Sequence, residues 1–224
     1  MGAREDVLAR IRDALRDVPG EEDVDVPRGY TRTRVQPEGT VERFCERVAD
    51  YRATVSRVPA GEVAAAVAAA FARVGATRVA APTGLPAEWT READGVELVR
   101  DSPQSPLSVA ELDSVDAVLT GASVGIAETG TFVLESDDLC GRRVLSLVPD
   151  VHVCVVSVDD VVDDVPAAIA RLRAGRPLTW VSGPSATSDI ELDRVEGVHG
   201  PRTLHLLVVE GDRPEASTAA SSPS

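Results

Sequence analysis

The chain has 224 residues, of which 43% are hydrophobic but only 3% aromatic, so its core must be built from valine, leucine, alanine and isoleucine. Such a mixture suits a buried parallel sheet covered by helices. The 23 basic residues stand against 37 acidic ones, which gives a formal net charge of −14. A surface this acidic repels phosphate backbones and anionic lipid headgroups, which argues against nucleic-acid and membrane-surface partners.

Missing residue types limit the chemistry further. The chain contains no lysine, so it can form neither a Schiff base nor a P-loop. Its cysteines, Cys45, Cys140 and Cys154, are widely spaced without a C-x-x-C pair, which fits neither a disulfide framework nor a cluster-binding set. The first residues are charged, and no apolar run reaches the roughly 18 residues of a membrane span. We therefore expect a cytoplasmic protein with no cofactor site in this chain.

The first part of the chain predicts two helices joined by a connector. Val7, Leu8 and Ile11 lie on one face of a helix over residues 3–16. A charged stretch with proline and glycine follows, and a second helix is expected over 40–52. Neither helix can bury its apolar face alone, so they predict an N-terminal helical arm. We place the domain boundaries at 1–39 for the first helix and connector, and at 40–211 for the main domain.

From residue 55 onward, helices alternate with strands. A helix over 62–74 has Gly75 as its C-cap, and a second is expected over 159–173. The expected strands cover residues 77–81, 96–99, 116–120, 130–135, 144–147, 151–157, 178–181 and 204–209. This alternation predicts an α/β fold with right-handed crossovers and an open, mainly parallel sheet. Residues 212–224, rich in serine, alanine and proline, predict a disordered tail.

A glycine-rich segment over 120–131 is the first candidate for chemistry. It packs glycines, threonines and the single carboxylate of Glu128 into a dozen positions after a hydrophobic strand. Glycines let the backbone approach a ligand and expose N–H groups that can hold an anion. The candidate ligand-binding residues here are Gly125, Thr129, Gly130 and Thr131. The structural alternative is a glycine-rich hairpin in which Glu128 is only solvated.

The second candidate covers residues 182–191, directly after an expected strand, where open α/β sheets place ligands. Ser185, Thr187 and Asp189 are the candidate ligand-binding residues, because hydroxyl and N–H groups at a helix start can hold a carboxylate or phosphate. Ser188 followed by Glu191 matches a capping box, so these two are interpreted as structural.

Histidine supplies the candidate acid–base group. His199 lies between glycines in a polar loop and can titrate near neutral pH, although a turn histidine bonded to the backbone is the alternative. His152 and His205 alternate with apolar residues, which predicts core or sheet-surface positions. The acidic pairs at 159–160 and 163–164 are expected at a helix start facing water. No spacing resembles a zinc site, so no metal ligand is assigned.

Three motifs, in order, resemble the LUD-domain proteins of the lactate utilisation protein C type. Gly125–Thr131 resembles the A-E-T-G-T signature of that family. Pro149–Val153 resembles its P-x-x-H segment. Ser185–Glu191, with Gly197–Pro201 behind it, resembles its S-x-T-x-D-I-E…G-x-H-G-P block. The resemblance covers residues from about 40 to 210.

The resemblance implies a Rossmann-like three-layer α/β/α fold, related to sugar-phosphate isomerases and CoA transferases. It also implies participation in the oxidation of L-lactate to pyruvate, with iron–sulfur clusters carried by partner subunits that include cysteine-rich proteins. The leading hypothesis has Glu128 and His199 as candidate catalytic residues in a pocket for a small carboxylate or phosphorylated ligand. One alternative is a free-standing isomerase or acyl/CoA-transferase using Glu128 as nucleophile or base. The other is a non-catalytic subunit that organises redox partners.

Overall fold

The computed structural model describes residues 2–17, 27, 29, 39–188, 194–196 and 200–211, with side chains at all of these except 186–188 and 194–196. The chain divides into two units, Met1–Thr31 and Arg32–Ser224. The first unit contains α1 (Ala3–Ala14), which confirms the first expected helix. The backbone N–H of Gly2 donates to Glu5, and no residue of α1 is buried.

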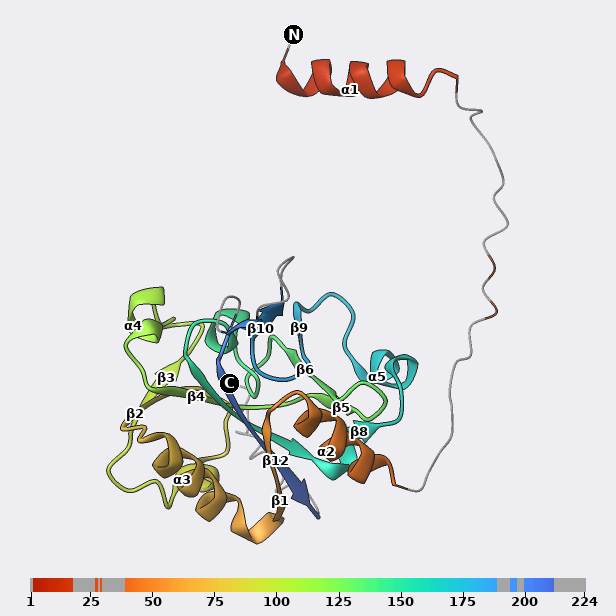
Figure 1. The fold of residues 1–224 in the computed structure, drawn as a ribbon. Helices are drawn as coiled ribbons and strands as arrows, with labels where there is room; N and C mark the ends of the chain where they lie inside the picture. The colour runs from red at the N-terminus through yellow and green to blue at the C-terminus, as the bar shows by residue number, and fades with distance from the viewer. Residues whose placement is uncertain are drawn as a thin grey trace, which may run out of the picture. The chain divides into compact units, whose positions relative to one another are not determined.

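The second unit holds the remaining elements (Figure 1). Its helices are α2 (Thr40–Asp50), α3 (Val63–Val74), α4 (Val109–Asp113) and α5 (Val165–Arg171), with 3-10 turns η1 (Ala60–Glu62), η2 (Ala87–Thr90), η3 (Arg143–Ser146) and η4 (Val158–Asp160). Its strands are β1 (Thr54–Pro59), β2 (Arg78–Pro82), β3 (Glu97–Asp101), β4 (Ala117–Gly121), β5 (Val124–Ile126), β6 (Thr131–Glu135), β7 (Val151–Ser157), β8 (Val161–Val162), β9 (Leu178–Val181), β10 (Ala186–Ser188), β11 (Arg194–Glu196) and β12 (Thr203–Glu210).

The main sheet has six strands in the order β1-β12-β7-β4-β2-β3, and every neighbouring pair is parallel. This confirms the expected α/β fold with a mainly parallel sheet. Its central strands are buried along nearly their whole length because a parallel sheet of this kind is covered on both faces. Strand β4, for example, is buried at all five positions.

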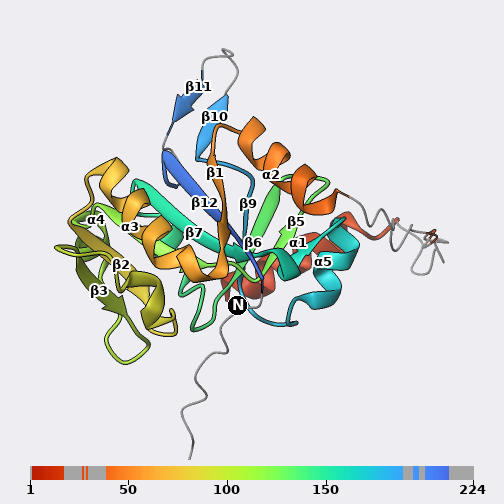
Figure 2. The same ribbon diagram turned by 90° about the horizontal axis from the view of Figure 1, so that it is seen from below.

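One face of the main sheet is covered by α3. Val67 and Phe71 of α3 pack with alternate residues of the strands, among them Leu119 and Val153. The helix ends at Gly75, whose positive φ of 67° is the left-handed C-cap expected from the sequence. In Figure 2, α3 and α2 lie on opposite sides of β1.

The other face of the main sheet is covered by α2, α4 and a second sheet, of order β8-β5-β6-β9. Phe44 and Val48 of α2 are fully buried against Phe132 of this second sheet and the main-sheet residue Cys154. Helix α5 packs on the far side of the second sheet through Ala168. The layered α/β arrangement is therefore as expected, whereas the second sheet was not predicted.

Two expected elements are wrong. Residues 144–147, expected as a strand, form the 3-10 turn η3, and the helix expected over 159–173 is replaced by η4, β8 and the shorter α5. Helix α5 begins late because Asp164 is its N-cap, with its side chain accepting a hydrogen bond from the N–H of Ala167 at 2.9 Å. Asp163 forms a 2.6 Å ion pair with Arg43 of α2. The pair at 163–164 therefore holds structure together instead of facing water.

Several expectations fall largely or wholly outside the described residues, namely the connector 17–39 and the tail 212–224. Within the described ranges, no helix combines the length and apolarity that crossing a bilayer requires. Cys45, Cys140 and Cys154 are free thiols, and the latter two are buried.

Candidate functional site

A cleft of about 270 Å³ lies where β7 and β12 begin. His152 and Leu204, each the second residue of its strand, form part of its wall. The other described lining residues come from three connecting segments and the edge of β9: Ser146, Leu147, Thr179, Trp180, Val181, Ser182, Gly183, Pro184, Ser185, Gly200 and Pro201. We call this hollow the histidine cleft. It lies at the amino ends of the parallel strands, whereas the sequence argument favoured their carboxyl ends.

His152 is the titratable side chain on this cleft wall within the part of the chain that the structure describes. It is only 1% exposed, and its Nε2 lies 2.8 Å from the hydroxyl of Thr120 on the neighbouring strand β4. Its ring meets Phe132 edge to face, with centroids 6.0 Å apart. Burial lowers the pKa of His152 to about 4, because the imidazolium ion loses its hydration there. The ring is therefore neutral at neutral pH.

The tautomer of His152 sets the direction of its hydrogen bond to Thr120. If Nε2 carries the proton, it donates to the Thr120 oxygen, and the Thr120 proton is left for the sulfur of Cys154 at 3.7 Å. In that tautomer Nδ1 carries a lone pair and no proton. No described residue is a hydrogen-bond partner of Nδ1.

Three hydroxyls form a row that ends at the cleft. Thr129 donates to Thr131 at 2.7 Å, and Thr131 lies 2.7 Å from the hydroxyl of Ser182, which lines the cleft. The register of β6 and β9 produces this contact, because Phe132 pairs with Val181 and so places the preceding and following residues opposite each other. Thr131 is 5% exposed and reaches the cleft only through Ser182.

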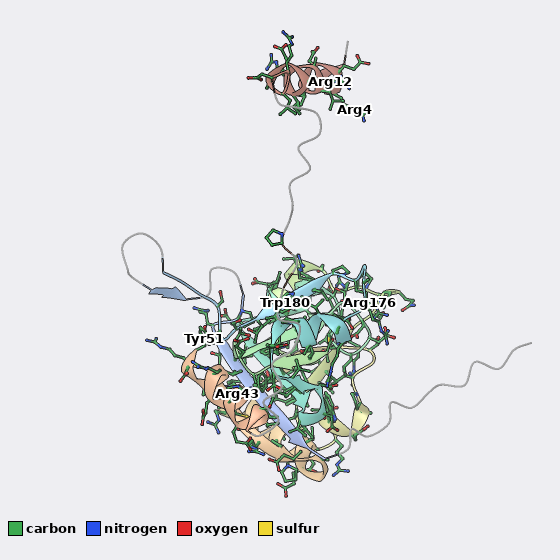
Figure 3. All side chains as sticks on the ribbon, turned by 90° about the vertical axis from the view of Figure 1, so that its right-hand side faces the viewer. Arg4, Arg12, Arg43, Tyr51, Arg176 and Trp180 are labelled. Carbon is green, nitrogen blue, oxygen red and sulfur yellow. The ribbon has the colours of Figure 1, made fainter. Side chains whose placement is uncertain are left out.

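The glycines of the first motif have a packing role. A Cβ at Gly125 would come within 2.9 Å of the Phe44 ring, and one at Gly130 within 2.6 Å of the backbone of Arg47. Both partners are on α2; Figure 3 labels Arg43 of this helix and Tyr51, the residue directly after it. These glycines allow α2 to approach the second sheet closely. The predicted ligand role of Gly125 and Gly130 stays a prediction, beside this structural reason for their presence.

Glu128 stands apart from the cleft. Its side chain is exposed, its backbone N–H donates to the carbonyl of Asp163 at 2.9 Å, and it is not among the described lining residues. Thr129 is also exposed. The candidate catalytic carboxylate and the cleft are therefore not brought together by the described contacts.

The second motif is divided between the cleft and a hairpin. Ser185 lines the cleft, and its N–H donates to the carbonyl of Pro201 at 2.7 Å, which joins the two halves of the motif block. Thr187 and Ser188 belong to β10, which pairs antiparallel with β11 (Figure 2). Ser188 pairs with Arg194 in this ribbon, and its predicted capping role stays a prediction because residues 189–193 lie outside the described ranges. Asp189, Glu191 and His199 lie outside the described residues.

Sequence reasoning singled out one part of the cleft wall and missed the rest. His152 was expected in the core or on the sheet surface, and it is buried but also lines the cleft; the P-x-x-H resemblance was the available signal. Ser182 fell at the start of the second candidate segment without being proposed as a ligand residue. The 42% exposed Trp180, labelled in Figure 3, carried no signal. Across the described ranges, no group of three or more histidine, cysteine or acidic residues could hold a metal ion.

Comparison with known proteins identifies the relatives. The model of the LUD domain matches residues 108–209, which include the cleft residues from Ser146 to Leu204. The chain is 52% identical to the lactate utilization protein C of Deinococcus radiodurans over 75% of this chain and 78% of that protein. It is 33% identical to the lactate utilization protein C of Bacillus subtilis over 55% of each chain. A crystal structure of a DUF162 family protein from Deinococcus radiodurans superposes with a TM-score of 0.65 at 41% identity, covering 79% of this chain and 99% of that one.

Proposed function

This chain belongs to the lactate utilization protein C family of LUD-domain proteins, and from that premise we propose that it serves lactate utilization. The specific reaction we propose is the oxidation of L-lactate to pyruvate. The chain acts as one subunit, together with iron–sulfur and cysteine-rich partner proteins. The histidine cleft is the place where the small carboxylate binds.

The observation that carries this proposal is the neutral, buried His152 on the cleft wall. Lactate becomes pyruvate by losing two electrons and two protons, one of them from the hydroxyl group. In the tautomer protonated at Nε2, a neutral imidazole can accept that hydroxyl proton at Nδ1 as a general base. Its pKa of about 4 makes it a weak base in the empty cleft, and a bound carboxylate beside the ring raises its basicity.

The C2–H bond would supply the two electrons and the second proton; clusters on the partner proteins would accept the electrons, and the proton would leave to solvent. This assignment is supported by the three widely spaced cysteines of this chain, which contain no cluster-binding spacing. The 41% exposed Leu147 and the 42% exposed Trp180 place apolar surface beside the cleft, which suits contact with a partner.

The test replaces His152 by glutamine in a tagged protein purified with its partners from lactate-grown cells. We expect lactate-dependent dye reduction to fall about 100-fold, the usual contribution of a general base. His205→Gln is the matched control, because His205 is also buried but lies on the α3 side of the sheet, where burial and then the charge of Arg73 lower its pKa. Wild-type turnover by His152→Gln would contradict the catalytic role.

Deletion of the chain and incubation with acyl-CoA test the two alternatives. A non-catalytic assembly subunit predicts that deletion abolishes lactate oxidation while His152→Gln leaves it intact. A transferase using Glu128 predicts a covalent adduct at Glu128 after incubation with acyl-CoA, and it draws no support from the cleft because Glu128 does not line it.

A further inference from the structure

The hydroxyl row at the cleft can run in one of two directions. Thr129 donates to Thr131 at 2.7 Å, so the Thr131 oxygen has accepted one hydrogen bond and retains its own proton. Either hydroxyl can be the donor in the 2.7 Å contact between Thr131 and Ser182. If Ser182 donates, the Thr131 proton is left with the Thr129 carbonyl at 3.5 Å, which is a weak contact. If Thr131 donates to Ser182, the row runs from Thr129 to the cleft.

This direction leaves Ser182 as a donor. Its oxygen accepts from Thr131, and no other described group takes its proton. Ser182 lines the cleft, so its O–H is available there to an acceptor. Hydroxyl groups in a chain polarise one another, which strengthens the last donor in the row.

The uncharged side chains of the remaining cleft wall make a hydroxyl donor such as Ser182 the group that can bind a carboxylate. None of the described lining residues carries a charged side chain, since they consist of hydroxyl, apolar and glycine residues with the neutral His152. A carboxylate in this place lacks an arginine partner among the described residues. The described groups that can hold it are hydroxyl and N–H donors, and a donor to a charged acceptor forms the stronger kind of hydrogen bond.

We propose that Ser182 binds the carboxylate of the substrate and that Thr131, buried behind it, is the positioning residue that orients the Ser182 hydroxyl toward the cleft. This inference rests on the proposed function for the identity of the substrate, a 2-hydroxy carboxylate. It goes beyond that function by assigning the subsite that distinguishes a carboxylate from a neutral group of the same shape. Thr129 is the first, exposed member of the row.

The test measures binding of lactate, acetate and the neutral isostere lactamide to the full-length chain by NMR titration. We expect the wild type to prefer lactate over lactamide. In Ser182→Ala and Thr131→Val this preference should fall roughly 10-fold, the effect of losing one hydrogen bond to a charged group. Thr131→Ser keeps the hydroxyl and should restore the preference. A merely structural role of Thr131 would weaken both ligands equally and leave the ratio unchanged.

Thr77→Val is the control for the loss of a threonine hydroxyl elsewhere, because Thr77 donates to Asp116 and does not line the cleft. It should leave the preference at its wild-type value. If the wild type binds acetate but not lactate, and the variants lose acetate selectively, the carboxylate subsite stands and the lactate proposal fails. If no carboxylate binds, or if Ser182→Ala and Thr131→Val keep the wild-type preference, the inference is overturned.

Discussion

Two hollows at opposite ends of the parallel strands differ in the charge of the side chains that line them. At the amino ends of β7 and β12 lies the histidine cleft, whose described wall is uncharged. At the carboxyl ends of β2 and β3 lies a smaller hollow of about 130 Å³, here called the aspartate cavity. Its lining consists of Pro82, Thr83, Asp101, Pro103, Ser136, Asp137, Asp138, Gly141 and Arg142.

By strand topology alone, the aspartate cavity is the better ligand site. The chain runs from β2 outward to β3 and then back to β4 on the other side of β2. Such a switch point is where open α/β sheets commonly bind ligands. Three of its four charged side chains, however, are already engaged in hydrogen bonds. Asp101 accepts from Arg142 Nε at 2.9 Å and from the N–H of Leu107 at 2.8 Å, and Asp137 accepts the N–H groups of Leu139 and Cys140.

The difference shows which property marks a ligand site in this protein. The polar groups of Asp101 and Asp137 are used to hold loops, whereas no described residue engages Nδ1 of the buried His152, and the exposed Ser182 has the Thr131 hydroxyl as its described partner. Buried polar groups are normally satisfied, so the unengaged nitrogen of His152 has a reason beyond stability. Unused donors and acceptors, not net charge, distinguish the histidine cleft.

Arg142→Met removes the ion pair in the aspartate cavity, and of the variants proposed it should reduce stability the most. The Asp101 side chain is only 3% exposed, so losing its partner leaves a buried carboxylate without its ion pair. We expect the free energy of unfolding to fall by about 4 kcal/mol, with lactate binding unchanged at temperatures where the protein is folded. Guanidinium denaturation measures the first and NMR titration the second.

Arg91→Ala is the control for this variant, because Arg91 forms an exposed pair with Glu92. It should change stability by less than about 1 kcal/mol. If Arg142→Met keeps full stability but loses lactate binding, the aspartate cavity, and not the histidine cleft, is the ligand site.

Gly130→Ala tests whether this glycine of the first motif is needed for the packing of α2. Gly130 has a positive φ of 60°, and a Cβ there would lie 2.6 Å from the Arg47 backbone. Left-handed strain and overpacking together should cost about 3 kcal/mol of unfolding free energy. Gly75→Ala is the matched control, with φ of 67° and open space around the added Cβ. It should cost only about 1 kcal/mol. Equal losses in the two variants would show that close approach of α2 is not why Gly130 is a glycine.

The elements that sequence predicted well are those whose pattern is local. Strands β7 and β9 match the predicted bounds because long or isolated apolar runs define them, and α3 ends at the predicted Gly75. Strand β5 was missed because it has three residues inside a glycine-rich segment. The helix predicted from residue 159 failed because Asp164 acts as an N-cap and delays the helix to Val165.

The candidate site was predicted only as separate segments. Motif resemblance pointed to Thr131 and Ser185, which the structure places behind and on the cleft wall. It did not point to Ser182 as a cleft residue or to Thr120 as the partner of His152. Both relationships depend on strand register between distant segments, β6 with β9 and β4 with β7. Register is a property of the whole sheet, so local sequence does not reveal it.

The pH dependence of stability tests whether His152 is buried and neutral, and its expected effect is the smallest of the three. The folded-state pKa of about 4 is depressed below the unfolded value of 6.5, so the unfolded chain binds more protons between these values. The stability that this difference provides is fully present above pH 6.5 and is lost as the pH falls through about 4. At pH 5 the free energy of unfolding has already decreased by about 2 kcal/mol. Urea denaturation from pH 7 to 5 should therefore show a shallower decline for His152→Gln than for the wild type. Parallel declines would place a charged or solvated imidazole at this position, and the uncharged wall that distinguishes the histidine cleft from the aspartate cavity would be lost.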